Sequence, residues 1–301
     1  MDVVVSLCDV GPRDGLQNDA VALPPATRAE LCERLAAAGL RRVEAASFVH
    51  PRLVPQMARA EDVLAALPDR PDTVWAALVL NAKGLERALA AGAREIHVAY
   101  PVTDGFATRN QNATAGEAAA IAERIITDGH AAGVKVTATL GVAFGCPFDG
   151  KVEPETVLAQ AERMAAAGAD ELMLADTVGV GVPSQVRALM PGALDVMGGR
   201  PVGLHLHNTR NTGYANVVAG LEEGATVFDA SIGGLGGCPF APRATGNIAT
   251  EDLVYLLEGL GVDTGADLEG LIAVAQWLGE RLGHDLPGLV HRAGPFAPVA
   301  G

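Results

Sequence analysis

An arginine and an aspartate stand between two glycines directly after the first apolar run of the chain. They are Arg13 and Asp14, in the segment GPRDGLQ that follows VVVSLCDV. A surface turn uses aspartate and glycine readily, but it has no need of an arginine. An aspartate also offers a hard oxygen ligand for a divalent cation. The segment therefore raises the question of which other polar residues the fold brings beside it.

Two histidines at the end of a predicted strand are the first of these residues. His205 and His207 lie two apart in GLHLHNTR, and side chains two apart on a strand face the same way, so both imidazoles can reach one ion. Taken alone, such a pair is more often structural. Asn247, in ATGNIATED, can add a carbonyl oxygen, although a helix N-terminus explains an asparagine there more simply. A set of oxygen and nitrogen ligands without thiolate favours Mg²⁺ or Mn²⁺ over structural zinc.

The elements that must position these residues follow a repeat. Eight short runs rich in β-branched residues are predicted strands, at residues 3–9, 41–48, 73–80, 95–101, 135–142, 171–176, 201–207 and 226–232. Between them lie alanine-rich segments whose apolar residues recur at helical spacing. Five of these helices are predicted to end on a glycine before the next strand, at Gly39, Gly92, Gly133, Gly168 and Gly224. The alternation predicts an α/β fold of the closed parallel (β/α)8 TIM barrel type, in preference to an open doubly wound sheet.

The barrel is expected to form a single catalytic domain over residues 1–301. Residues 267–283 are predicted to form one additional helix, within a C-terminal helical extension that covers residues 264–301. Closure places the first strand beside the eighth, with the seventh next to it. Loops at the C-terminal ends of the strands build the active site of such a barrel. Asp14, the histidine pair and the loop after the eighth strand are therefore predicted to converge at its mouth.

Two more carboxylates lie at strand ends. We place Glu44, in VEAASF, toward the end of the second predicted strand and Asp176, in LADTVG, at the end of the sixth. Each carboxylate can bind a metal directly, or it can form a hydrogen bond that orients a metal ligand or Arg13. We favour the second role. For Asp176, capping the segment that follows is an equally good explanation.

A glycine-rich loop after the last strand carries a cysteine. The loop is GGLGGCPF, residues 233–240, and the cysteine is Cys238. Glycines there permit positive φ and a close approach of the backbone to a ligand. The spacing does not match the GxGxxG of dinucleotide-binding folds, so a nucleotide site is excluded. We interpret Cys8 and Cys32 as core residues and Cys146 as structural.

Composition excludes several classes of function. The formal net charge is −14 and no basic cluster exists, so nucleic acid is not an expected partner. No apolar run approaches the roughly 20 residues of a membrane span, so no membrane association is expected. The N-terminus lacks the basic region of a secretory leader, and the four cysteines contain no CxxC pair. We therefore expect a cytoplasmic protein with free thiols.

Six segments together resemble one family, the 3-hydroxy-3-methylglutaryl-CoA (HMG-CoA) lyases of the DRE-TIM metallolyase superfamily. In chain order they are GPRDGLQN, VEAASFVHPRLVPQM, FGCPFDGKV, LADTVGVG, GGLGGCPFAP and TGNIATEDLVYLLEGLG. The resemblance implies divalent-metal-dependent cleavage of HMG-CoA to acetyl-CoA and acetoacetate, the lyase reaction of leucine catabolism and ketone body metabolism. It also implies that the cation, Mg²⁺ or Mn²⁺, is held by Asp14, His205, His207 and Asn247.

The same resemblance implies roles for further residues. Arg13 polarises the thioester carbonyl, and Cys238 is the base near the C3 hydroxyl, with His205 as an alternative base or proton relay. Glu44 and Asp176 support the site. Contacts to the acyl-CoA substrate are expected from Gln17, Ser47, Gly236 and Gly237. The expected assembly is a homo-oligomer, a dimer or higher.

One position departs from the family pattern. The family often has an aspartate after the histidine pair, as in HxHDT, whereas this chain reads HLHNTRNTG, with Asn208 and Arg210. A lost carboxylate and a gained cation there can change which acyl-CoA or acid fits.

Two other functions stay open at this point. A related metal-dependent aldolase or carboligase, similar to citramalate or isopropylmalate synthases, usually carries a substantial C-terminal region, whereas only residues 264–301 follow the last segment here. The second is a barrel that binds a ligand without catalysis, in which the predicted metal ligands would have no function although each is chemically able to bind a metal.

Overall fold

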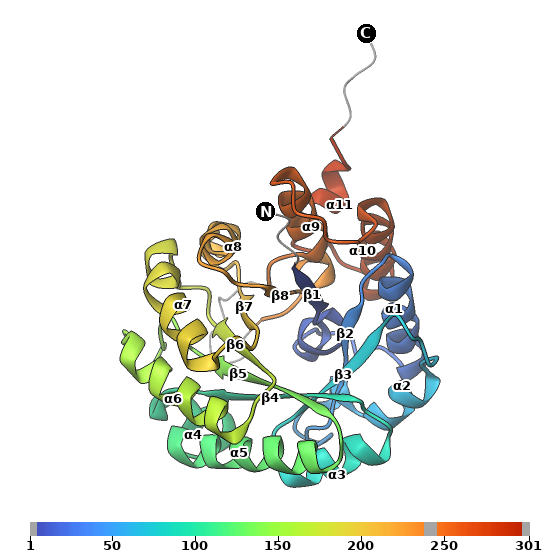
Figure 1. The fold of residues 1–301 in the computed structure, drawn as a ribbon. Coiled ribbons are helices and arrows are strands. Elements are labelled where there is room, and N and C mark those ends of the chain that lie inside the picture. The colour runs from blue at the N-terminus through green and yellow to red at the C-terminus, as the bar shows by residue number, and fades with distance from the viewer. Residues whose placement is uncertain (1–4, 238–245, 297–301) are drawn as a thin grey trace.

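The computed structural model describes residues 5–237 and 246–296, and it shows eight parallel strands closed into a barrel in chain order (Figure 1). The strands are β1 Ser6–Asp9, β2 Arg42–Ser47, β3 Val74–Val79, β4 Glu95–Pro101, β5 Lys135–Gly141, β6 Glu171–Asp176, β7 Val202–Leu206 and β8 Val227–Ala230. The pairing of β1 with β8 closes the ring. The predicted TIM barrel is therefore confirmed, and each observed strand lies inside its predicted run.

Helices form the outer ring around the strands (Figure 1). They are α1 Pro25–Ala37, α2 Ala60–Ala66, α3 Ala82–Ala90, α4 Asp104–Gln111, α5 Ala115–Ala131, α6 Pro154–Ala167, α7 Pro183–Met197, α8 Gly213–Glu222 and α9 Thr250–Gly259. The five glycines predicted to end helices all have positive φ, between 78° and 98°. Left-handed backbone is open to glycine without steric cost, so these residues turn the chain back into the next strand.

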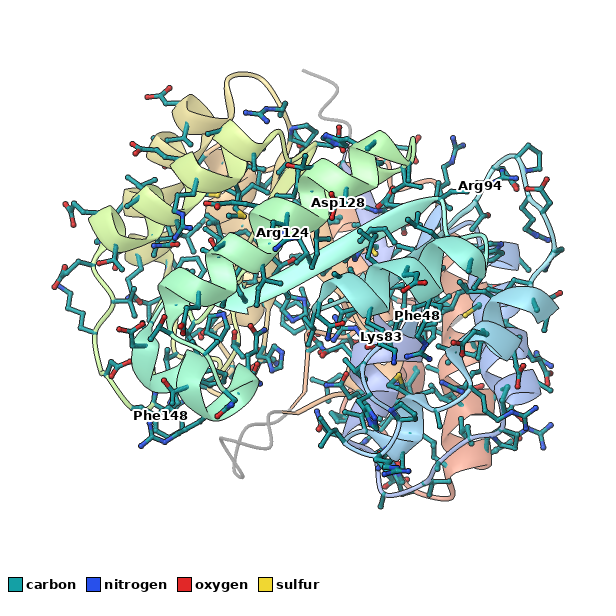
Figure 2. The ribbon with its side chains drawn as sticks, turned by 90° about the horizontal axis from the view of Figure 1, so that it is seen from below. Phe48, Lys83, Arg94, Arg124, Asp128 and Phe148 are labelled. Carbon is teal, nitrogen blue, oxygen red and sulfur yellow. The ribbon has the colours of Figure 1, made fainter. Side chains whose placement is uncertain are left out.

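Helix α5 shows why such segments lie outside the strands. Arg124 and Asp128, one turn apart, point away from the barrel (Figure 2). Ala122, Ile125 and Ile126 are fully buried on the opposite side of the same helix. Removal of that apolar face from water drives the packing of helix on sheet. None of the described helices is long and apolar enough to cross a membrane.

The chain after the barrel reaches back to the site end of β8. Helix α10, Leu268–Leu282, is the additional predicted helix, and it packs on α1, on α9 and on the short turn η3, Ile232–Gly234. The segment before the last helix, α11 Val290–Ala293, is held by Asp252, which accepts hydrogen bonds from the backbone N–H groups of Leu289 and Val290. Gly288 N–H donates to the carbonyl of Gly233 at 2.8 Å. The C-terminal segment thus supports the start of the glycine-rich loop.

Candidate active site

Three of the predicted metal ligands converge at the mouth of the barrel. His205 lies on β7, His207 directly follows it, and Asp14 lies in the turn η1, Gly11–Gly15, after β1. The two Nε2 atoms are 3.2 Å apart, and each lies 3.9 Å from Asp14 Oδ2. Closure of the ring between β1 and β8 brings residues from the two ends of the chain to one point.

Close packing explains the glycines that flank Arg13 and Asp14. The carbonyl of Val10 accepts the N–H groups of residues 13, 14 and 15, which winds the chain into a tight turn. A Cβ on Gly11 would lie 2.7 Å from Asp9 Oδ1, and one on Gly15 would lie 2.6 Å from Ser231 Oγ. Neither distance leaves room for a side chain. The glycines therefore let the turn lie directly against the chain that follows β8.

Asn247 joins the cluster from the chain after β8. Its Nδ2 donates to Asp14 Oδ2 at 2.8 Å and to the carbonyl of Leu235 at 3.1 Å. Its Oδ1 is buried and has no hydrogen-bond partner among the described residues. A buried acceptor left in that state costs about 1–3 kcal/mol. The orphaned oxygen therefore calls for a cation or a donor that binds at this point.

The donor set fits a hard divalent cation. It combines a carboxylate, two imidazole nitrogens and an amide oxygen, and the ligand atoms of Asp14, His205 and His207 all lie within 4.8 Å of one another. Two ligands at right angles around an ion, each about 2.1 Å from it, lie about 3 Å apart, close to the separation of the two Nε2 atoms. Oxygen and nitrogen donors without thiolate suit Mg²⁺ or Mn²⁺.

Asp229 orients one of the histidines, and the sequence reasoning missed it. In the ladder between β7 and β8 it lies opposite His205, and its Oδ2 is 3.2 Å from His205 Nδ1. The second imidazole nitrogen, Nε2, is thereby turned toward His207 and Asp14. Burial alone would lower the pKa of His205, but the carboxylates of Asp229 and Asp14 outweigh it and raise that pKa. The sequence feature that could have identified Asp229 is an acidic residue at an inward-facing position of the last strand.

Arg13 is held between two carboxylates. Its Nε donates to Glu44 Oε2, and its NH1 donates to Asp14 Oδ1 at 2.7 Å. Burial alone would raise the pKa of Asp14, but Arg13 and the two histidines outweigh it and lower that pKa to about 2. Burial is likewise outweighed at Glu44, whose pKa lies below its ordinary value, chiefly because of Arg13. Both acids are therefore ionised at neutral pH, and the guanidinium stays charged between them.

Asp176 contacts the backbone of its own loop. Its two carboxylate oxygens accept the N–H groups of Val180 at 2.9 Å and Gly181 at 2.8 Å. Burial raises its pKa above the ordinary value despite these bonds. In the described part of the chain, its hydrogen bonds therefore go to the loop after β6 rather than to Arg13 or the metal ligands. This geometry matches the alternative explanation for Asp176, in which it caps the segment that follows its strand.

Two of the predicted substrate contacts carry buried polar atoms without partners in the part of the chain that the structure describes. Ser47 ends β2, the strand that carries Glu44, and Gln17 follows the turn that carries Arg13. Ser47 Oγ and Gln17 Oε1 are buried and lack hydrogen-bond partners within residues 5–237 and 246–296. Buried polar atoms in such a state are suited to a ligand that supplies the missing partner.

The glycine-rich loop passes directly over Asn247. A Cβ on Gly236, whose φ is +131°, would lie 2.6 Å from Asn247 Nδ2. The carbonyl of Gly237 accepts a hydrogen bond from Asn18 Nδ2 at 2.9 Å, which ties the loop to the chain after η1. Gly236 therefore lies against Asn247, and the next residue, Gly237, is joined to the chain after η1. Cys238, the predicted base, lies outside the described residues.

The two residues that depart from the family pattern join neighbouring loops. Arg210 NH1 donates to the carbonyls of Val178 and Gly179, at 3.2 and 2.9 Å. Asn208 Oδ1 accepts the N–H of Gly213 at 3.1 Å. The added cation thus joins the loop after β7 to the loop after β6.

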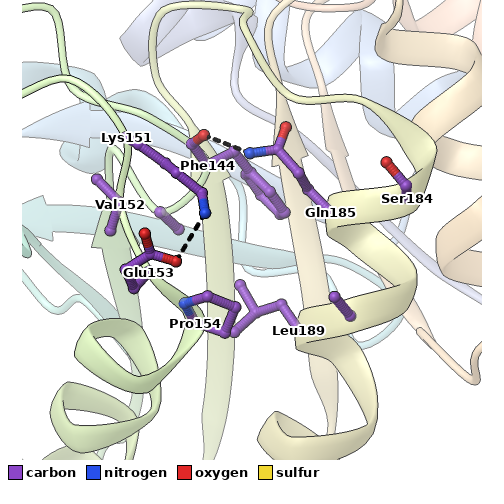
Figure 3. A pocket seen from close by; sticks show the side chains of 10 residues that line it. Phe144, Lys151, Val152, Glu153, Pro154, Ser184, Gln185 and Leu189 are labelled. Atoms are coloured by element: carbon purple, nitrogen blue, oxygen red, sulfur yellow. Dashed lines mark hydrogen bonds and ion pairs between the residues drawn. The ribbon is translucent and has the colours of Figure 1, made fainter.

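A separate hollow lies beside the loops after β5 and β6 (Figure 3). Lys151 and Glu153 form an ion pair at 2.9 Å on one side, and Gln185 donates to the carbonyl of Phe144 at 2.9 Å on the other. Its described lining includes none of the predicted site residues. The hollow is therefore separate from the cluster of Asp14, His205, His207 and Asn247.

Comparisons with known proteins identify the family of the chain. The HMGL-like family model matches residues 4–278. The chain is 49% identical to an (R)-citramalyl-CoA lyase of Chloroflexus aurantiacus, with 98% of this chain and 96% of the relative covered. It is 38% identical to a hydroxymethylglutaryl-CoA lyase of Bacillus subtilis, with 94% and 95% covered. A solved HMG-CoA lyase from Acinetobacter baumannii, in complex with coenzyme A and 3-methylmalate, has a TM-score of 0.94 at 35% identity and covers 100% of this chain and 99% of its own.

Proposed function

The chain belongs to the HMGL-like family and is a carbon–carbon lyase, and from this premise we propose that it cleaves a tertiary 3-hydroxyacyl-CoA thioester to acetyl-CoA and a keto acid. The observation that carries the proposal is the convergence of Asp14, His205, His207 and Asn247 beside a fixed Arg13. The bond that breaks joins the hydroxyl-bearing carbon to the methylene next to the thioester carbonyl.

Four side chains would hold the cation, which we propose to be Mg²⁺ or Mn²⁺. They are Asp14, His205, His207 and Asn247, the last through its unpartnered Oδ1. When bound, a divalent cation polarises the hydroxyl and carboxylate oxygens of the substrate and makes the hydroxyl proton more acidic. Asp229 keeps His205 in the orientation that this binding needs.

Arg13 is proposed to stabilise the enolate. Of its five N–H groups, the described contacts engage Nε–H with Glu44 and one NH1 hydrogen with Asp14. The remaining donors can meet the thioester oxygen as the electron pair of the breaking bond moves onto it. A preorganised cation in a site shielded from water stabilises such a developing charge strongly.

We assign Cys238 as the group that accepts the proton of the substrate hydroxyl. His205 is the alternative, but both of its nitrogens are already directed to other groups, Nδ1 to Asp229 and Nε2 to the metal ligands. Cys238 follows Gly237 in the sequence, and Gly236, two residues before it, lies against Asn247. Its thiolate would take the hydroxyl proton, and the resulting thiol can then protonate the enolate carbon.

(R)-Citramalyl-CoA is the first candidate substrate and HMG-CoA is the second. In citramalyl-CoA the carboxylate stands directly on the hydroxyl-bearing carbon, whereas HMG-CoA carries one more methylene between them. The 49% identity to a citramalyl-CoA lyase supports the shorter acid, and so does the bound 3-methylmalate, an isomer of citramalate, in the solved relative. The family match and the 38% identity to an HMG-CoA lyase support the second candidate.

The products distinguish the candidates. We would incubate the metal-loaded protein with (R)-citramalyl-CoA, its S isomer and HMG-CoA, and measure acetyl-CoA, pyruvate and acetoacetate by mass spectrometry. Acetyl-CoA with pyruvate identifies the first substrate, and acetyl-CoA with acetoacetate identifies the second. Chelation should abolish either reaction, and Mg²⁺ or Mn²⁺ should restore it. Thioester binding without turnover would instead support a binding barrel, and condensation of acetyl-CoA with a keto acid to a free acid and CoA would support a carboligase.

A further inference from the structure

The barrel interior below Arg13 is filled with charged side chains. TIM barrels usually fill this space with layers of branched apolar residues. Here Arg42 on β2 reaches Glu171 on β6 at 2.7 Å and Thr137 on β5 at 2.8 Å, and it also pairs with Glu95 on β4. All four side chains are buried. A buried ionic network has to be held together by partners on every side, because unpaired charges are costly in such surroundings.

His97 connects this network to the active site. It lies on β4 two residues after Glu95, so both side chains face the same way. Its Nδ1 is 2.8 Å from Glu44 Oε1. On the other side of the ring, Nε2 is 3.1 Å from Glu95 Oε1 and 3.2 Å from Arg42 NH2. The ring therefore bridges Glu44, which binds Arg13, and the charged layer below.

The direction of one of these hydrogen bonds does not depend on protonation. A carboxylate oxygen only accepts, so Nδ1, which faces Glu44, must carry a hydrogen. Nε2 faces a donor, Arg42, and an acceptor, Glu95, so it is satisfied with or without a proton. His97 thus donates to Glu44 both as imidazole and as imidazolium.

We propose that His97 is a positioning residue for the enolate-stabilising guanidinium, and this rests on the proposed function. By donating to Glu44 Oε1, it holds the carboxylate so that Oε2 accepts from Arg13 Nε. Arg13 in turn directs its NH1 to Asp14. Without the donor on His97, the Glu44 carboxylate is free to rotate about its terminal bond, and the guanidinium loses its fixed orientation.

The charge of His97 supports the same arrangement. Burial alone would lower the pKa of His97, but hydrogen bonds to Glu44 and Glu95 outweigh it and raise that pKa to about 9. At neutral pH an imidazolium therefore lies between two carboxylates. It strengthens the bond to Glu44, because a charge-assisted hydrogen bond is shorter and stronger than a neutral one.

The first test compares two substitutions at one position. His97→Leu removes the donor, and His97→Asn keeps one, since the amide Nδ2 can take the place of Nδ1. We expect His97→Leu to lower kcat by roughly 10- to 100-fold, the scale of a misplaced catalytic group, with KM changed less than about threefold because the proposed substrate contacts are not altered. His97→Asn should recover most of kcat. His130→Leu is the matched control, because it removes a histidine–carboxylate pair with Asp170 on the outside of the barrel, and its kcat should stay at the wild-type value.

A double-mutant cycle tests whether His97 acts through Glu44. If it does, His97→Leu should have no further effect on kcat in a Glu44→Gln background, and the two losses should not add. Additive losses would overturn the proposal, and so would a His97→Leu protein that is folded by circular dichroism and retains wild-type kcat. A purely structural role would lower the melting temperature of His97→Leu and His97→Asn without this coupling.

A second readout does not require turnover. The Nε–H signal of Arg13, assigned in a ¹⁵N-labelled protein by its loss in Arg13→Lys, reports on the hydrogen bond to Glu44. We expect this signal to move upfield and to exchange faster with water in His97→Leu, but not in His130→Leu. An unchanged signal would overturn the role of His97. Absence of thioester cleavage by the wild-type protein would count against the proposed function alone.

Discussion

Asn247 Nδ2 donates a hydrogen bond to Asp14 Oδ2 at 2.8 Å across 233 positions of the sequence. The bond holds the turn after β1 against the chain after β8, and Asn247 Oδ1 stays buried without a hydrogen-bond partner among the described residues. Two proposed ligands that lie far apart in the sequence are thus oriented by each other. Preorganisation of this kind lowers the cost of assembling the site.

Removal of the amide should weaken metal binding. Asn247→Ala deletes a proposed ligand and also the donor that orients Asp14, so we expect Mn²⁺ affinity to fall by about tenfold or more. Titration followed by electron paramagnetic resonance measures the free ion directly. Asn208→Ala is the control, because that amide caps the start of α8, and its Mn²⁺ affinity should stay unchanged. Equal affinities in wild type and Asn247→Ala would remove Asn247 from the ligand set.

Asp229 and Asp176 should differ in what they support. Asp229→Asn replaces the charged acceptor that turns His205 toward its neighbours with a neutral amide, so we expect a fall of about 10- to 100-fold in Mn²⁺ affinity. Asp176→Asn weakens bonds to backbone N–H groups of its own loop, so the free energy of unfolding should fall while the affinity for Mn²⁺ is retained. Calorimetric titration and urea unfolding separate the two effects, and identical behaviour of the two variants would contradict this assignment.

A single methyl group on the glycine-rich loop should damage the site. Gly236→Ala places a Cβ 2.6 Å from Asn247 Nδ2 at a residue with φ of +131°. We expect turnover to fall at least tenfold, because Asn247 is displaced, on the scale of other small shifts of catalytic groups. Gly116→Ala is the matched control, since a Cβ there, on α5, meets open space. Wild-type activity in Gly236→Ala would show that the loop does not lie on Asn247 during the reaction.

Loss of the thiol should separate chemistry from metal binding. Cys238→Ala removes the proposed proton acceptor but none of the proposed ligands. Turnover should therefore be nearly abolished while Mn²⁺ affinity stays at the wild-type value, as measured by product formation and by calorimetry on the same preparation. Retained turnover would transfer the base to His205 or to another group.

The contribution of His97 to stability should depend on pH in a defined direction. Its pKa is about 9 in the folded protein, above the ordinary 6.5. The folded state therefore binds the proton more tightly, and the stabilisation is fully present below pH 6.5 and is lost as the pH rises through 9. The difference in unfolding free energy between wild type and His97→Leu should accordingly be largest near pH 6 and level off at a smaller value near pH 10. Urea unfolding at each pH measures it, and a difference that grows with pH would be inconsistent with a protonated His97.

Local patterns in the sequence predicted the elements well. A run of β-branched residues and a glycine that closes a helix are recognisable without knowledge of their neighbours, because both depend on backbone conformation within a few residues. Gly168, for example, has φ of +98° at the end of α6, as its position predicted. The strand boundaries moved by a residue or more where ladder hydrogen bonds give way to loops, as at Ser231, where the chain leaves β8.

The pairing of His205 with His207 also followed from the sequence, since two residues on one strand share a face by local geometry alone. Contacts between strands did not follow. Asp229 meets His205, and Glu44 meets His97, only because the register of β7 on β8 and the curvature of the closed barrel place them within reach. Asp176 ends β6 as predicted, yet its contacts go to its own loop, whereas Glu44 lies inside β2 and not at the strand end where it was expected. Residue types and their order determined the fold and the kind of chemistry, whereas register and closure, which depend on the packing of the whole chain, decided which charged group holds which.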